Sequence, residues 1–272
     1  SNTGVVASDT TGVGTARAVL AAAGYGTDKA IFGFGTTNFG GGSASMTNLV
    51  SNTGVVANDT AGVGTARGFV AAAGYGTDKA IFGYGRNDSS IDLSMTNLVS
   101  NTGVVGNDVT GVGTGRSGLA AAGYGTDKAI FGFGETAGAV YVSLTNLVSN
   151  TGVVSNDTAG VGTARVFVGA AGYGSDKAIF GYGAITGGTV SSLTNLVTNT
   201  GVVGNNVTGV GTARTYITAT SYGIGTAIFG FGYPGGPSYT SITNLVSNTG
   251  VVANDTSGVG TARFLLAAAS YG

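Results

Sequence analysis

The sequence repeats with a period of about 49 residues, and this period restricts the possible folds more than any other feature. Each unit contains one Thr-Ala-Arg or Thr-Gly-Arg motif. The arginines of this motif are Arg17, Arg67, Arg116, Arg165, Arg214 and Arg263. Periods of this length are typical of closed or stacked repeat architectures. We therefore treat 1–272 as a single repeat domain, with units at 1–50, 51–99, 100–148, 149–197 and 198–246 and a half unit at 247–272.

Every unit predicts β-strands. Glycine, β-branched and aromatic residues dominate, and no stretch sustains a period of 3.6 residues. We expect a first strand as in Leu20–Gly26, a second as in Lys79–Gly85, a third as in Met95–Val105, and a shorter fourth near each TGVGTAR segment. Thr-Gly and Asn-Asp-Thr segments between them favour turns. Four short strands in each unit favour an all-β fold, a β-propeller of four-stranded blades.

Residue size predicts where the strands pack. The Ala-Ala-Ala-Gly run of the first strand suits the crowded innermost position of a blade. The larger residues Ile31, Phe32, Leu49 and Val50, with their copies, are expected to fill the space between blades.

The units resemble kelch-type β-propeller repeats, including kelch-like repeat proteins of bacteria and phages. The matching features are an arginine (Arg67), a small apolar strand (Val70–Gly76), a second strand ending in glycines (Ile81–Gly85), a variable loop, and a third strand (Met95–Val105). The double glycine of the family appears here as Gly-Phe-Gly or Gly-Tyr-Gly, and its tryptophan is absent. The resemblance covers every copy and implies a propeller.

The number of repeat units does not correspond to a whole number of blades. Five complete units and half of a sixth are present. Five blades with a terminal extension are favoured. Six blades would lack the middle strands of one blade, and the surplus strands would otherwise pair with another molecule or continue into a longer array.

Composition excludes several functions. The chain has no Cys and no His, so disulfides, thiolate–zinc sites and His-dependent nucleophilic centres lack their parts. With 11 basic and 12 acidic side chains it cannot form the concentrated positive surface that nucleic acids require. No apolar run approaches the ~20 residues that span a bilayer. The single Glu offers no pair of opposed carboxylates. We therefore expect no enzymatic activity, cofactor, metal, nucleic-acid partner or membrane insertion.

Charges that recur in each unit are interpreted as structural. The six arginines are expected to cap backbone carbonyls or to pair with acids between blades, rather than to grip an anion. The pair Asp28-Lys29 and its copies are expected in the turn between the first and second strands. Asn58-Asp59-Thr60 has too few carboxylates for a calcium loop, so turn and cap hydrogen bonding is the better explanation.

One segment differs in every copy, between the second and third strands. Loops on a rigid scaffold are where binding usually occurs, although unconstrained drift also produces variation. The candidate ligand-binding residues in this segment are Asn38, Phe39, Arg86, Asp88, Asp92, Glu135, Tyr141, Tyr233 and Tyr239. The two residues after each repeat arginine form a second variable patch, for example Val166-Phe167 and Thr215-Tyr216.

The leading hypothesis is a non-enzymatic binding or adhesion module that recognises a carbohydrate or a protein surface through these loops. The alternative is a structural subunit of an extracellular filament or phage particle, which would assemble with copies of itself through the unmatched half repeat. Low charge and a mean hydropathy of +0.31 fit the packing against neighbours that this alternative requires. Low charge with abundant Thr, Ser, Asn and Gly favours an extracellular or virion-surface location.

Overall fold

The computed structural model describes residues 3–38 and 41–271, and its regular structure consists of β-strands alone. No helix in this part of the chain could cross a membrane.

Each complete unit forms one three-stranded antiparallel sheet, and we number the sheets 1 to 5 in chain order. The first strands are β1 (Ala21–Tyr25), β6 (Ala71–Tyr75), β9 (Ala120–Tyr124), β14 (Gly169–Tyr173) and β17 (Thr218–Tyr222). The second, central strands are β2 (Lys29–Gly33), β7 (Lys79–Gly83), β10 (Lys128–Gly132), β15 (Lys177–Gly181) and β18 (Thr226–Gly230). The third strands are β5 (Thr47–Val50), β8 (Thr96–Val99), β13 (Thr145–Val148), β16 (Thr194–Val197) and β19 (Thr243–Val246).

Two of the variable loops form small hairpins of their own. One is β3 (Thr36–Asn38) with β4 (Gly41–Ser43), and the other is β11 (Glu135–Thr136) with β12 (Val140–Tyr141).

The predicted third strand is too long, and the predicted fourth strand is wrong. The chain turns after Val99, because the Ser100 hydroxyl accepts hydrogen bonds from the amides of Thr102 and Val104. Val105 then returns antiparallel to pair with Val99 through an isolated bridge. The TGVGTAR segments form no strand; the residues that pair with the third strand lie earlier, in the Val-Val-x-Asn-Asp segment.

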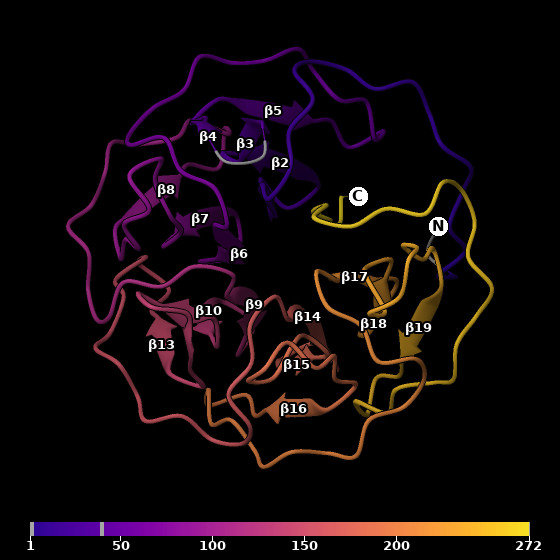
Figure 1. The fold of residues 1–272 in the computed structure, drawn as a ribbon. Coiled ribbons are helices and arrows are strands. Elements are labelled where there is room, and N and C mark those ends of the chain that lie inside the picture. The colour runs from indigo at the N-terminus through magenta and orange to yellow at the C-terminus, as the bar shows by residue number, and fades with distance from the viewer. Residues whose placement is uncertain (1–2, 39–40, 272) are drawn as a thin grey trace.

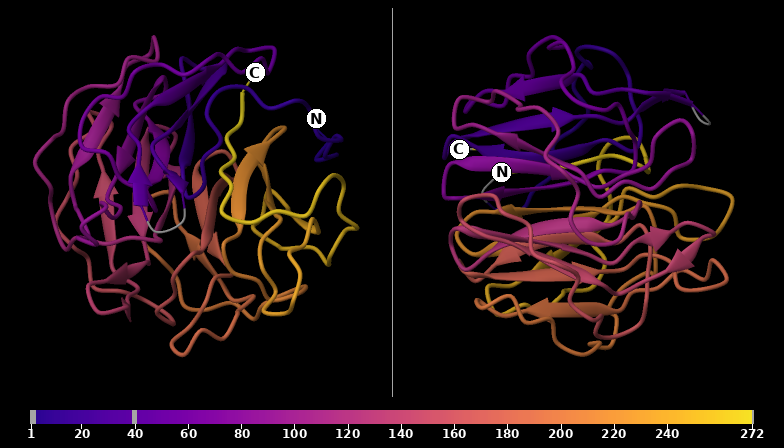
Figure 2. Two further views of the ribbon diagram at one scale, coloured as in Figure 1. Left: turned by 45° about the horizontal axis from the view of Figure 1, so that its top comes forward. Right: turned by 90° about the vertical axis from the view of Figure 1, so that its left-hand side faces the viewer.

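The five sheets lie side by side around a common centre (Figure 1). The first strands are innermost, since β1, β6, β9, β14 and β17 contact one another in succession. Small side chains permit this crowding, and the prediction for the Ala-Ala-Ala-Gly run is confirmed. Seen from the side, the sheets stack as layers, with the β3–β4 hairpin projecting at the edge opposite both termini (Figure 2).

Large apolar side chains fill the space between successive sheets, as predicted. One core joins sheets 1 and 2 through Ile31, Phe34 and Phe82, all completely buried. In four of the five central strands, the phenylalanine lies against a glycine of the preceding sheet: a Cβ atom at Gly33 would lie 2.8 Å from Phe82 Cζ. Glycine is therefore required there by close approach rather than by backbone conformation. Phe32 of β2 is the exception and is only partly buried.

Both chain termini occupy the space between sheet 5 and sheet 1. A Cβ atom at Gly24 would lie 3.3 Å from the Ser270 carbonyl oxygen, and one at Gly74 would lie 3.3 Å from the Gly24 carbonyl oxygen. Residues 266–271 therefore lie beside β1 as β1 lies beside β6. On the outside, Asp9 accepts a hydrogen bond from the Thr261 amide. The half unit thus continues the succession of inner strands instead of extending away from it.

Candidate functional site

The repeat arginines donate hydrogen bonds to backbone carbonyls and polar side chains of the protein. Arg67 is completely buried. Its Nε donates to the Tyr84 carbonyl (2.7 Å), and its two terminal nitrogens donate to the Thr65 carbonyl (2.8 Å) and to Asn97 Oδ1 (2.6 Å). Burial lowers the pKa of Arg67 to about 10, and the charge of Asp108 opposes this shift. The side chain remains a cation at neutral pH, and no anionic ligand has access to it.

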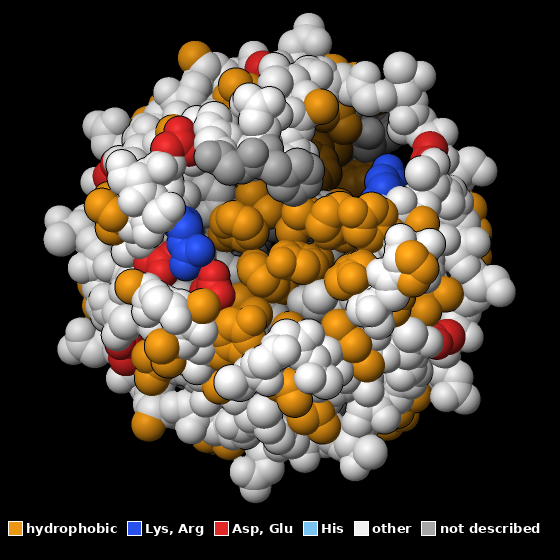
Figure 3. Space-filling view, in the orientation of Figure 1, with side chains coloured by type: hydrophobic (Ala, Val, Ile, Leu, Met, Phe, Trp, Pro, Cys, Tyr) orange, Lys and Arg blue, Asp and Glu red, His pale blue; other side chains and the backbone are white. Residues whose placement is uncertain are grey.

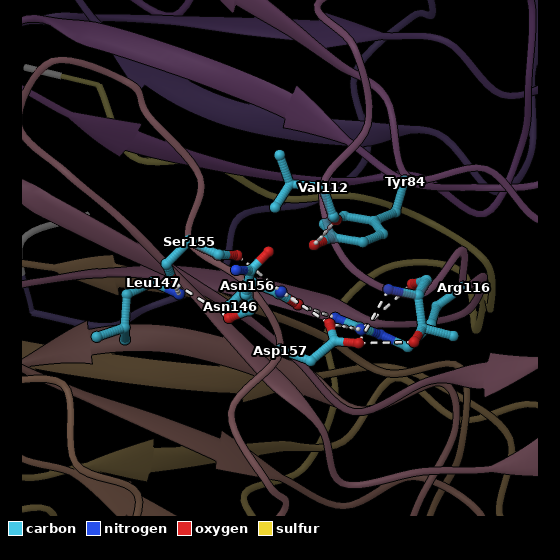
Figure 4. Close-up of polar contacts among 9 residues, drawn as sticks. Tyr84, Val112, Arg116, Asn146, Leu147, Ser155, Asn156 and Asp157 are labelled. Carbon is cyan, nitrogen blue, oxygen red and sulfur yellow. Dashed lines mark hydrogen bonds and ion pairs between the residues drawn. The ribbon is translucent and has the colours of Figure 1, made fainter.

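An aspartate from the following unit pairs with three of the buried arginines, Arg67, Arg116 and Arg214. Arg116 donates to Asn146 Oδ1 (2.6 Å) and to Asp157 Oδ1 (3.2 Å), and Asn146 donates to the same carboxylate (Figure 4). The guanidinium carbon also lies 4.7 Å from the centroid of the Tyr84 ring, in the preceding sheet. Arg116 therefore connects three segments of the chain through a cation–π contact and hydrogen bonds, and Arg67, Arg165 and Arg214 make the same kinds of contact.

The Asp-Lys pair lies in the turn between first and second strands, as predicted. Asp28 pairs with the adjacent Lys29 at 2.7 Å and accepts a hydrogen bond from Asn52. The hydrogen bond from Lys29 lowers the pKa of Asp28 more than any other contact. Both side chains are partly exposed, so the pair adds little stability.

The second residue after each arginine forms a ring around the centre, which we call the axial ring. Its members are Val19, Phe69, Gly118, Phe167, Tyr216 and Leu265. All six have left-handed backbone conformations, with φ between 50° and 61°. Backbone amides link neighbours around the ring: Phe69 donates to Val19 (2.9 Å), and Phe167 donates to Gly118 (2.7 Å).

The variable loops begin directly beside the axial ring. Isolated bridges pair the residue before five of the six ring members with the start of a loop, for example Gly68 with Arg86 and Ser117 with Glu135. The two variable regions of the sequence therefore meet at one end of the molecule. Figure 3 shows this end, with hydrophobic side chains gathered at its centre and polar loops around them.

Aromatic rings form a continuous line across this end, which we call the aromatic patch. Its members are Phe69, Phe167, Tyr216, Phe264, Tyr239 and Tyr233. Phe167 stacks on Tyr216, and Tyr239 stacks on Phe264, each with ring centroids 4.0 Å apart. Gly118 makes the line possible, because a Cβ atom there would lie 2.7 Å from the Phe167 ring. Tyr239 remains 47% exposed.

A charged cluster adjoins the aromatic patch. Arg86 pairs with Asp92 of its own loop at 2.8 Å and with Glu135 of the next unit at 3.1 Å. Burial raises the pKa of Glu135, whereas the Arg86 charge opposes this shift. Burial also raises the pKa of Tyr216, and the charge of Glu135 contributes next. The cluster and the patch therefore share one surface.

The other predicted loop residues have different surroundings. Tyr141 pairs with Glu135 across the β11–β12 hairpin and lies beside the cluster. Asp88 accepts a hydrogen bond from the Ser43 amide (3.0 Å), so it fastens two loops together. Asn38 is exposed at the end of β3, and Phe39 lies outside the described residues. Most of the predicted ligand-binding residues thus lie on one surface, and Asp88 connects two of the loops.

The predicted set did not include the axial ring, although the sequence showed that its residues vary. The available signal was the aromatic residue two positions after the arginine in three units. What could not be read from the sequence was the left-handed backbone that directs these side chains to the centre.

The opposite end of the central axis is polar and nearly identical in units 1 to 4, whereas Ser221, Gly225 and Thr226 line it in unit 5. A cavity of about 420 Å³ is lined there by Tyr25, Thr27, Lys29 and their copies. Each lysine in this set lies 2.7–2.9 Å from the aspartate beside it, so the local charges are balanced.

No model of a protein family matches the chain, and no curated protein sequence matches it significantly. Arguments about function therefore rest on the geometry.

Proposed function

We propose that this chain forms a kelch-like β-propeller with six blade positions and acts as a non-enzymatic binding module. Support for the propeller comes from the arrangement of five sheets around a centre and from the six members of the axial ring. Each of five blade positions is occupied by a three-stranded sheet. The sixth blade position, between sheets 5 and 1, is occupied by both terminal segments of the chain.

The binding surface in this proposal is the end that carries the aromatic patch and the charged cluster. The observation that carries the proposal is that the two regions that differ between all repeats meet there, while the opposite end of the axis keeps the same residues in units 1 to 4 apart from one Thr-to-Ser change. Drift would have altered both ends alike. Selection for a composite contact surface alters one.

The shape of this surface favours an extended ligand. The depression at the centre of the axial ring has a volume of about 90 Å³, well below the ~300 Å³ or more of small-molecule sites. Exposed aromatic rings beside paired charges are typical of surfaces that bind proteins or sugar chains. The ligand is therefore a carbohydrate chain or a protein surface, and the module belongs at a cell exterior or on a virion.

Binding to arrayed oligosaccharides and proteins tests the proposal, with two exposed variants compared. Tyr239→Ala removes the most exposed ring of the patch and is expected to weaken binding at least about tenfold. Ile224→Ala, in the turn between β17 and β18, is the control and should bind as the parent does. A ligand that binds both variants equally well would show that the patch is not the binding surface.

A second candidate function is a structural subunit that assembles with copies of itself. The incompletely filled blade position between sheets 5 and 1 favours this candidate function, because strand edges and apolar side chains are exposed there. Light scattering tests this candidate: the 26.3 kDa chain would increase in mass with concentration.

A further inference from the structure

All four lysines of the chain line one cavity. This cavity lies at the end of the central axis opposite the aromatic patch, and we call it the axial cavity. Its lysines are Lys29, Lys79, Lys128 and Lys177, which occupy the same position in units 1 to 4. Their side chains are 42–44% exposed, so solvent reaches the axial cavity where the lysines lie.

The fold brings the lysines together because each one follows an innermost strand. β1 begins two residues after Val19 of the axial ring and ends at Tyr25, and the turn to β2 leads to Lys29. The inner strands β1, β6, β9 and β14 lie side by side around the centre (Figure 1). Their turns therefore place four cations in an arc around the axis. In unit 5, Gly225 and Thr226 replace the Asp-Lys pair.

The aspartates beside the lysines lie outside the axial cavity. Each carboxylate is 2.7–2.9 Å from its lysine, so the charges balance in number. The second oxygen of Asp28 accepts a hydrogen bond from Asn52, in the turn after the third strand, and that of Asp78 accepts one from Asn101. Among the described residues, no aspartate or glutamate lines the axial cavity. The nearer charge dominates the potential at any point, so the potential inside the cavity is positive.

The lysine–aspartate pairs leave the ammonium groups able to bind a second anion. Lys29 Nζ donates one hydrogen bond, to Asp28 at 2.7 Å, and an ammonium group has three N–H donors. The copies of this pair make the same single contact. An exposed pair of neighbouring residues is also a weak interaction, so a ligand can compete for the lysine.

The size of the axial cavity suits a small organic ion. Its volume of about 420 Å³ falls within the ~300–1,000 Å³ of small-molecule sites, unlike the depression of about 90 Å³ at the axial ring. Glycines of the inner strands form part of its wall, and their lack of side chains leaves room for a ligand. These glycines are Gly24, Gly74, Gly123 and Gly172.

We propose that the axial cavity binds a small polyanion, a molecule whose several phosphate or carboxylate groups each contact a different lysine. Anionic groups joined in one molecule reach several lysines at once, so every contact after the first is intramolecular and the affinity increases. The near-identity of units 1 to 4 at this end suits a ligand that carries the same chemical group several times. The axial cavity and the aromatic patch lie at opposite ends of the axis, so this proposal and the proposed function can fail separately.

Calorimetric titration of the intact chain with inorganic tripolyphosphate tests the proposal. We expect saturable 1:1 binding at low salt, which weakens as sodium chloride is added because salt screens the lysine charges. A parallel titration with benzene-1,3,5-tricarboxylate compares the two kinds of anionic group. The probe that binds more tightly identifies phosphate or carboxylate as the group that the cavity takes.

Labelling of the lysines with acetic anhydride locates the bound probe. Every lysine of the chain lines the axial cavity, so a bound polyanion should slow the acetylation of all four by at least about threefold. Saturable binding that leaves the labelling of all four unchanged would place the probe elsewhere and overturn the proposal.

Three variants separate the position of a charge from the net charge. Asp127→Asn frees Lys128 from its carboxylate and should tighten binding at least about threefold. Asn205→Lys changes the net charge equally at an exposed position outside the cavity, and should bind as the parent does. The double variant Asp127→Asn/Lys128→Gln keeps the parent net charge and should bind at least about threefold more weakly. The melting temperature of each variant without probe checks that it is folded.

Absence of saturable binding of both probes to the parent chain would overturn the proposal. Equal binding by the folded double variant and the parent would overturn it too, because the lysines would then not be the contact. Equal tightening by Asp127→Asn and Asn205→Lys would attribute binding to net charge and would likewise rule out the axial cavity as the site.

Discussion

A buried arginine recurs in four of the five complete units, and one of these four arginines lacks the carboxylate that accompanies the others. Arg67, Arg116 and Arg214 each lie within 4 Å of an aspartate from the following unit. At Arg165 the corresponding residue is Asn206, which holds the same Thr163 amide through its Oδ1 atom. Burial lowers the pKa of Arg165 to about 10 with no carboxylate to oppose it. This unit therefore keeps the hydrogen bond to the threonine amide but has no carboxylate to pair with its arginine.

Asn206→Asp should stabilise the protein, because it returns a carboxylate to a buried cation in a site already shaped for one. We expect the free energy of unfolding in urea to increase by about 1 kcal/mol. Asn205→Asp, which adds the same charge at the neighbouring exposed position, is the matched control and should change it by less than about 0.5 kcal/mol. Equal effects of the two substitutions would attribute the gain to net charge.

The linking aspartates also predict how stability depends on pH. Burial tends to raise the pKa of Asp157, but hydrogen bonds from Thr114 and Asn146 and the charge of Arg116 together lower it. The pKa values of Asp108 and Asp255 are lowered in the same way. A carboxyl with a lowered folded-state pKa contributes stability above its unfolded pKa of about 3.9 and loses it as the pH falls through the folded value.

We therefore expect the urea midpoint to fall progressively below about pH 4, because the unfolded chain binds more protons there. Asp157→Asn should lower the midpoint at neutral pH and flatten this acid dependence. An unchanged slope in that variant would show that Asp157 does not contribute to it.

At the scale of elements, the first and second strands and the turn between them follow from the sequence, since a run of small residues, an Asp-Lys turn and an Ile-Phe pair specify them locally. The predicted fourth strand is absent. The residues that follow each third strand pair with it only through two isolated bridges, Val50–Val56 and Thr47–Thr60 in the case of β5, and contacts this short leave no pattern in the sequence. The charged part of the candidate site was predicted from variation alone. The axial ring depends on backbone conformations that several residue types adopt here, so no residue type predicts it.

The glycines of the central strands give a prediction at this scale. Gly181→Ala should destabilise the protein by about 1–3 kcal/mol, because its Cβ atom would lie 2.7 Å from the Phe229 ring in a closely packed core. Gly230→Ala occupies the same position in sheet 5 without a facing ring, and should change stability by less than about 0.5 kcal/mol. Thermal and urea unfolding of the two variants check this contrast. Equal destabilisation would mean that glycine is needed for the strand itself.

For the whole molecule, the two ends of the chain meet through Asp9. Its carboxylate accepts from the Thr261 amide (2.9 Å) and pairs with Arg263, the contacts that Asp157 makes with Thr114 and Arg116 inside the chain. The hydrogen bonds from Thr261 lower the pKa of Asp9 most. The terminal segments are thus joined by the same interaction that joins successive units.

Asp9→Ala should lower the melting temperature less than Asp157→Ala does, because its pair is exposed and Arg263 can regain water. Asp157→Ala leaves the buried Arg116 without its carboxylate and should cost about 2 kcal/mol. Calorimetry of both variants makes the comparison. A larger effect of Asp9→Ala would mean that the junction of the termini limits the stability of the whole chain.

The left-handed axial ring has a consequence for how such a surface changes over time. All six ring residues share one left-handed backbone conformation, and the amides of Val19, Phe69, Gly118 and Phe167 donate to the carbonyl of the neighbouring ring residue. Valine, phenylalanine, glycine, tyrosine and leucine already occupy this one conformation within a single chain. A substitution at one of these positions therefore changes the side chain on the surface but not the backbone conformation that orients it. Duplication of units and mutation at these six positions can therefore produce many different binding surfaces while the fold stays the same.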